Sequence, residues 1–168
     1  LICGIVLAIF AGVHIWNSAR SLSLGSRTED LGLTHRFGFY PAEKTPEGQA
    51  FSWTRKTAGL SVTVNGPELF LSLKASHPGI AERPVHVKIS LVTGVFREKR
   101  LLGTAELGHT GWKKLRYPVS EEPGTDAILL FEVDRMWNPH DAVGSDDDRN
   151  IGVAVGEIGF AGGHQQTP

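Results

Sequence analysis

The chain has 168 residues, 40% of them hydrophobic and 21% charged, which suits one globular domain of about 120–140 residues with an attached segment. Seventeen basic and 18 acidic side chains give a formal net charge of −1, which excludes a general electrostatic attraction to nucleic acid or anionic lipid as the basis of function. The single cysteine, Cys3, excludes a disulfide within the chain.

The uncharged, apolar segment of residues 1–16 predicts a membrane helix. At 1.5 Å rise per residue it covers about 24 Å, and a few more apolar residues upstream would complete the ~30 Å hydrocarbon core of a bilayer. We therefore expect a single transmembrane helix over residues 1–19. A cleaved signal peptide and a lipoprotein signal are the competing interpretations, although apolar residues rather than a polar tether follow Cys3.

Three side chains near the end of this segment are expected at the membrane interface. Trp16 suits the aromatic belt, and Arg20 lies just beyond it. His14 is expected to reach water or headgroups, the alternative being an imidazole that ligates a haem or chlorophyll-type metal. Arg20 and Arg27 lie on the carboxyl side, which the positive-inside tendency places in the cytoplasm, so the residues alone leave the orientation open.

Residues 20–50 predict a linker and entry loop, because glycines and prolines interrupt any sustained strand or helix period. Within this region, residues 35–43 group Phe37, Phe39 and Tyr40. This run predicts either a first edge strand or a patch that lies against the domain or the bilayer.

From Phe51 onward, apolar residues alternate with polar ones, which is the main signal of a half-buried strand. The cleanest run is residues 85–91, and residues 127–133 are almost continuously apolar, which predicts a strand covered on both faces. The Asn65-Gly66-Pro67 sequence predicts a hairpin turn. Further runs fall at residues 51–53, 60–64, 69–73, 101–107, 112–119 and 151–160.

About eight short strands at roughly 8–12-residue spacing, with no convincing amphipathic helix, predict an all-β fold. We expect an antiparallel β-sandwich of jelly-roll type over residues 51–160. Residues 161–168 are expected to form a flexible tail.

A succession of motifs connects these strands to a known kind of domain: FGFYPAE, FSWTRKTAGLSV, ERPVHVKISL, GWKKLRYPV and FEVDRMWNPHDAVGSDDDRNIGVAV. Together they resemble the carbohydrate-binding-module-like β-sandwich at the extracytoplasmic carboxyl end of bacterial O-antigen polymerase/ligase and glycosyltransferase-type membrane proteins. The similarity covers residues 37–160. Its most specific element is Trp137-x-Pro139, followed by an Asp-rich turn, Arg149 and a Gly-Val-x-Val strand.

The resemblance implies a carbohydrate-binding accessory domain associated with envelope glycan assembly. It also implies a location at the bacterial inner membrane, with the domain on the extracytoplasmic, periplasmic side. The resemblance does not extend to the polytopic part where the family's chemistry resides, so no transferase or ligase activity is implied.

The carboxylates of Asp146, Asp147 and Asp148 are the candidate metal ligands, because Ca²⁺ takes 6–8 oxygens from such groups. The favoured interpretation is an Asp-rich turn that pairs with Arg149. No cofactor is expected beyond this candidate structural calcium.

Aromatic side chains give the candidate ligand contacts. Trp53 and Trp112 lie in or beside alternating strands and are predicted to fill the core, although three tryptophans could instead form a sugar-stacking platform. The loop tryptophan, Trp137, is the stronger candidate. The predicted ligand or partner contacts are Trp137, Asn138, His140 and Arg149.

The seven histidines show no HExxH spacing, and no GxSxG, P-loop or GxGxxG motif is present, so we expect no catalysis. The predicted function is a non-catalytic, membrane-anchored accessory or scaffold subunit that contacts a larger integral membrane-protein complex. The alternative is an extracytoplasmic carbohydrate-binding module. Nucleic acid is not an expected partner, and the glycan alternative loses its main support if Trp53, Trp112 and Trp137 are all buried.

Overall fold

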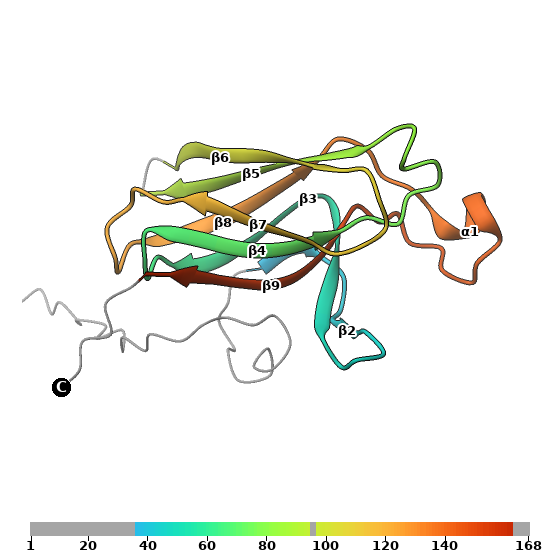
Figure 1. Cartoon of the computed structure of the whole chain (residues 1–168), viewed down its shortest axis with the longest axis horizontal. Helices are drawn as coiled ribbons and strands as arrows, with labels where there is room; N and C mark the ends of the chain where they lie inside the picture. The colour runs from blue at the N-terminus through green and yellow to red at the C-terminus, as the bar shows by residue number, and fades with distance from the viewer. Residues whose placement is uncertain (1–35, 95–96, 163–168) are drawn as a thin grey trace, which may run out of the picture.

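The computed structural model describes residues 36–94 and 97–162 (Figure 1). The predicted transmembrane helix over residues 1–19, including His14, Trp16 and Arg20, and the predicted tail from residue 163 onward lie outside the described residues. No helix in the described part is long and apolar enough to cross a membrane.

The described residues form nine strands and one short helix. The strands are β1 (Arg36–Phe39), β2 (Glu43–Lys44), β3 (Ala50–Thr63), β4 (Glu68–Lys74), β5 (Val85–Thr93), β6 (Glu98–Leu107), β7 (Lys113–Pro118), β8 (Asp126–Val133) and β9 (Ala154–Ala161), and the helix is α1 (Pro139–Val143). Every strand pairing is antiparallel. The all-β, antiparallel fold class predicted from the alternating pattern is therefore confirmed.

The strands follow the order β6-β5-β8-β3-β9-β4-β7, with β1 and β2 paired to β3. The long strand β3 takes part in two layers: residues 57–63 pair with β8, whereas Ser52 and Trp53 pair with β9. We call β1-β3-β8-β5-β6 the first sheet and β3-β9-β4-β7 the second sheet. Figure 1 shows β5, β6 and β8 on one side of the molecule and β4 and β9 on the other.

The core lies between the two sheets and follows the predicted alternation. Val85, Val87, Ile89 and Leu91 of β5 are fully buried, and so is Phe131 of β8. Each fully buried side chain of this size contributes about 1.5–3 kcal/mol relative to exposure. In the second sheet, β4 supplies Leu69, Leu71 and Leu73 to the same cluster.

The predicted hairpin at Asn65-Gly66-Pro67 is wrong, because β3 and β4 do not pair. Residue Thr63 at the end of β3 pairs with Asp126 of β8, and both edges of β4 are occupied by β7 and β9. The turn instead carries the chain from the first sheet to the second. A residue from outside β3 and β4 holds this turn, since the Val119 N–H donates to the Pro67 carbonyl oxygen at 2.7 Å.

Several predicted boundaries also differ from the structure. The edge strand suggested within residues 35–43 exists as β1, inside the predicted linker. The last strand begins at Ala154 rather than Ile151, because Ile151 forms an isolated bridge with Trp137. The short helix α1 was not expected; Asn138 caps it by accepting a hydrogen bond from the Asp141 N–H.

Thr54 ties the two sheets together at the point where β3 crosses between them. Its N–H donates to the Val153 carbonyl oxygen (2.8 Å), its carbonyl oxygen accepts from the Gly152 N–H (2.7 Å), and its Oγ1 accepts from the Val153 N–H (3.0 Å). A Cβ at Gly152 would lie 2.6 Å from Thr54 Oγ1 and 3.1 Å from the Arg55 carbonyl oxygen. The crossing therefore requires glycine at position 152.

Gly152→Ala is expected to lower the free energy of unfolding by about 1–3 kcal/mol, because the added methyl group overpacks a buried crossing. Urea unfolding followed by tryptophan fluorescence measures the change. Gly108→Ala is the matched control, since a Cβ there meets only Pro84 Cγ at 3.8 Å. Equal stability of the two variants would contradict this account of the crossing.

Candidate ligand-binding face

The outer face of the second sheet carries a cluster of aromatic side chains. Phe51 and Trp53 of β3 point away from the core, because Ser52 and Thr54 between and beside them are fully buried. Trp112, immediately before β7, completes the cluster. The Phe51 ring lies 5.9 Å from the Trp53 ring and 5.8 Å from the Trp112 ring, in edge-to-face arrangements. We call Phe51, Trp53 and Trp112 the aromatic cluster; all three are half-buried.

The predicted core positions of Trp53 and Trp112 are therefore wrong. The alternating pattern predicts the strand correctly but assigns the wrong side to the core, since the small polar residues Ser52 and Thr54 take the inward positions. Because these tryptophans are not fully buried, the condition that would have removed the main support for glycan binding is not met. No sequence signal indicated this orientation, because the polar character of Ser52 and Thr54 also favours Phe51 and Trp53 as the inward residues.

Two glycines of β9 provide the surface on which aromatic rings rest. A Cβ at Gly156 would lie 3.0 Å from Trp112 Cζ3, and a Cβ at Gly159 would lie 2.3 Å from Phe70 Cζ. Trp112 and the half-buried Phe70 thus lie against bare backbone. Trp53 pairs with Ala154, so the aromatic positions extend along β9 from residue 154 to residue 159, which is about 16 Å at ~3.3 Å per step.

Polar groups surround these rings on the same face. Ser72 Oγ accepts a hydrogen bond from the Glu157 N–H at 2.9 Å, and a Cβ at Gly156 would lie 3.2 Å from Gln49 Nε2. Arg116 of the edge strand β7 forms an ion pair with Glu68 of β4. The Ser72 hydroxyl is buried, so the polar groups next to the flat aromatic surfaces are the amide and charged ones, a combination that recognises polar ligands with apolar faces.

The predicted contact residues of the loop after β8 form local interactions, although Trp137 Nε1 is buried without a hydrogen-bond partner among the described residues. Trp137 bridges to Ile151 through both backbone hydrogen bonds (3.0 and 2.9 Å). Asn138 Nδ2 donates to the Asp148 carbonyl oxygen at 2.7 Å, and His140 Nδ1 lies 2.8 Å from the Ser145 carbonyl oxygen. Trp137 is half-buried, with its ring 6.0 Å from that of His77. These contacts close the loop upon itself.

Arg149 fastens this loop to the start of the domain. Its Nε and Nη2 each donate to a different oxygen of Asp147 at 2.8 Å, and its Nη1 donates to Glu43 at 2.8 Å. The hydrogen bond from Arg149 holds the pKa of Asp147 below its usual range, and Asp147 in turn raises the pKa of Arg149. The guanidinium also lies 5.1 Å from the centre of the Tyr40 ring. The predicted pairing of the Asp run with Arg149 is confirmed for Asp147.

The three aspartates do not gather into a cation site. Asp146 and Asp148 are exposed, and both oxygens of Asp147 accept from Arg149. Across residues 36–94 and 97–162, no group of three or more His, Cys, Asp or Glu side chains is placed to hold a metal ion.

His77, in the segment after β4, is a deeply buried ionisable side chain, at 2% exposure. Its Nε2 lies 3.1 Å from the Arg135 carbonyl oxygen. Burial lowers the pKa of His77, because the charged imidazolium loses hydration there. The neutral form is therefore part of the folded state.

The comparisons with known proteins concern the fold. No protein-family model matches the chain, and no curated protein matches it. Solved structures similar to it include two variants of CBM29-2, a family 29 carbohydrate-binding module: one is 14% identical with a TM-score of 0.46, the other 12% identical with a TM-score of 0.47, and each match covers 77% of this chain and 81% of that chain. A further family 29 module is 14% identical, with 74% of each chain covered and a TM-score of 0.43. The resemblance to O-antigen polymerases and ligases is not shown by these comparisons and stays a prediction.

Chelation is expected to leave the melting temperature unchanged, because Arg149 rather than a cation satisfies Asp147. Thermal unfolding with and without excess EDTA measures this. A fall in Tm after EDTA that added Ca²⁺ restores would contradict the structure of the Asp-rich turn.

Acidification is expected to destabilise the domain through His77. The pKa of His77 is lowered in the folded state, so the unfolded chain binds the proton first as the pH falls. The stability contributed by neutral His77 is complete above about pH 6.5 and declines as the pH falls below that value. His77→Gln should flatten the dependence of the unfolding free energy on pH between about pH 7 and 5. His109→Gln, at an exposed histidine, should leave the slope as it is; a slope equally steep in both variants would contradict the assignment.

Proposed function

We propose that this chain is a non-catalytic glycan-binding module whose ligand lies on the outer face of the second sheet. The observation that carries this proposal is the aromatic cluster of Phe51, Trp53 and Trp112, half-buried on a sheet face instead of packed in the core. A sugar ring has apolar C–H faces and polar edges. Aromatic rings cover the faces, while hydroxyl and amide groups hydrogen-bond the edges.

The rings on this face are held in place before any ligand arrives. Trp112 rests on Gly156, and Phe51 touches both tryptophans, so neither tryptophan needs to be ordered from a freely rotating state. Less conformational entropy is then lost on binding. Such a preorganised surface favours a stacking ligand over a loosely fitting one.

The shape of the surface supports an extended ligand. The positions that support aromatic rings stretch along β9 from Ala154, opposite Trp53, to Gly159 beneath Phe70. A face that spans about 16 Å, at ~3.3 Å per strand residue, is longer than one sugar ring. The module is thus proposed to bind a run of sugar units in a polysaccharide.

Membrane attachment and the scaffold role stay predictions. Both depend on residues 1–19, which lie outside the described part of the chain. An extracytoplasmic location, also still a prediction, would place the proposed face where envelope glycans occur. The two roles are compatible, because glycan binding uses only the second sheet.

Trp53→Ala and Trp112→Ala are each expected to weaken glycan binding roughly tenfold or more, since losing a stacking surface of this kind costs about 1.4 kcal/mol or more. Affinity electrophoresis of the full chain in gels containing soluble β-glucan, mannan or bacterial O-antigen polysaccharide measures retardation, and calorimetry then gives Kd for the polysaccharide that retards.

Phe37→Ala is the matched control, because Phe37 is an exposed aromatic of the first sheet, at 49% exposure. It should bind as the unchanged chain does. Retardation by none of the three polysaccharides, or equal losses in Phe37→Ala and Trp112→Ala, would overturn the proposed face.

A further inference from the structure

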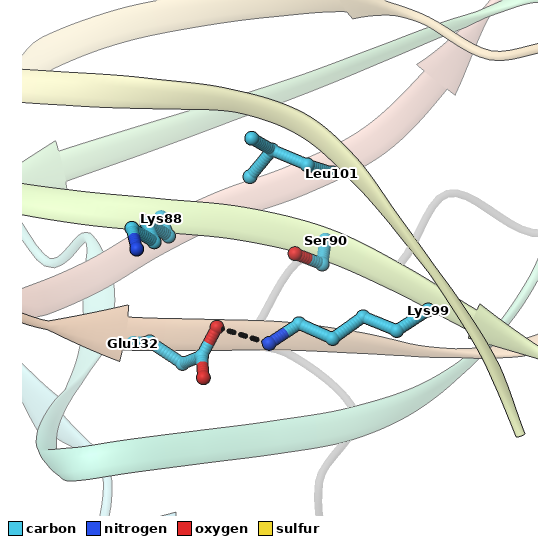
Figure 2. A pocket seen from close by; sticks show the side chains of 5 residues that line it. All are labelled: Lys88, Ser90, Lys99, Leu101 and Glu132. Atoms are coloured by element: carbon cyan, nitrogen blue, oxygen red, sulfur yellow. Dashed lines mark hydrogen bonds and ion pairs between the residues drawn. The ribbon is translucent and has the colours of Figure 1, made fainter.

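A recess lies on the outer face of the first sheet, away from the aromatic cluster. It has a volume of about 260 Å³ and is lined by Lys88 and Ser90 of β5, Lys99 and Leu101 of β6, and Glu132 of β8 (Figure 2). Figure 2 shows the five side chains around one shallow space, with Lys99 reaching across it to Glu132.

The recess exists because a small residue sits between large ones. In the strand pairing, Ser90 lies between Leu101 on β6 and Leu130 on β8. Adjacent side chains on one face of a sheet stand side by side, so the short serine leaves a dent between the two leucines. Leu101 is 54% exposed and forms an apolar wall.

The polar groups of the recess have unused hydrogen-bonding capacity. Ser90 is fully buried, and its Oγ has no partner among the described residues. Lys88 likewise forms no ion pair or hydrogen bond within residues 36–94 and 97–162, although it lies opposite Glu132 in the strand register. A buried hydroxyl without a partner and an unpaired ammonium group favour a ligand that supplies acceptors.

The ion pair over the recess is easily exchanged. Lys99 Nζ lies 2.5 Å from Glu132 Oε2, and the two side chains are 45% and 35% exposed. Pairs with this much exposure contribute little to stability, because solvent screens them and two flexible side chains must be ordered. A ligand can therefore separate Lys99 from Glu132 at small cost and reach Ser90.

We propose that this recess binds a carboxylate-bearing sugar unit, such as a uronic acid residue. Two lysines would face its carboxylate, Ser90 and Glu132 would hydrogen-bond its hydroxyl groups, and Leu101 would pack against a C–H face. A simple anion leaves Glu132 and Leu101 unused, and a neutral sugar leaves Lys88 unpaired. The lining matches a ligand that combines charge, hydroxyls and an apolar face.

This site goes beyond the proposed function, since it lies on the other sheet and needs none of the aromatic cluster. If both sites are occupied, one module contacts two separate glycan segments. Its test is accordingly built so that loss of one site leaves the other measurable.

The experiment is an NMR titration of the ¹⁵N-labelled full chain in mild detergent with sodium D-glucuronate, and with D-glucose at the same ionic strength. Glucuronate should shift the amide signals of residues 88–90, 99–101 and 132, whereas glucose should not. Lys88→Gln should raise the Kd for glucuronate roughly fivefold or more, because a charge-assisted hydrogen bond is lost.

Two control variants have their substitutions in or beside the second sheet instead of the first. Lys114→Gln removes a lysine there, and Trp112→Ala removes a ring of the aromatic cluster; both should bind glucuronate normally. Equal shifts with glucose, unchanged affinity in Lys88→Gln, or loss of glucuronate binding in Trp112→Ala would each overturn the proposal. Failure of polysaccharide binding at the aromatic cluster would leave these shifts intact, so the two proposals fail separately.

Discussion

The architecture depends on one strand that pairs with both sheets. Backbone groups of β3 must be hydrogen-bonded along its whole length, and they find partners in β8 at one end and in β9 at the other. Thr54 makes the change of partner with three hydrogen bonds to Gly152 and Val153. Because Phe51 and Trp53 precede this point, the same crossing that joins the sheets also sets the aromatic cluster on the second one.

Strand content and core positions could be predicted from the sequence, because burial on one face imposes a period of two. Val85, Val87, Ile89 and Leu91 appear in the core as expected. Pairing partners could not be predicted in this way: Asn65-Gly66-Pro67 has hairpin chemistry, yet the edges of β3 and β4 are taken by other strands. At residues 65–67, long-range strand pairing therefore overrides the local preference for a hairpin turn.

The candidate site was harder to predict for a related reason. Alternation predicts that the apolar side of a strand faces inward, and residues 51–54 do not follow it. In residues 51–54 the two bulky aromatics lie outside and the serine and threonine inside, since Thr54 Oγ1 is needed by the Val153 N–H. The Asp-rich loop has the composition of a ligand site, yet Arg149 binds the Asp147 carboxylate and Asn138 Nδ2 donates to the Asp148 carbonyl oxygen.

The glycines beneath Trp112 and Phe70 determine where the aromatic rings sit, although they carry no aromatic or polar group themselves. A ring seated on bare backbone keeps its height above the sheet only while positions 156 and 159 lack a side chain. Replacing either glycine would lift or tilt a ring without altering any group that is proposed to touch a ligand. If this face binds a ligand as proposed, substitutions at positions 156 and 159 change its preference while the aromatic residues themselves stay the same.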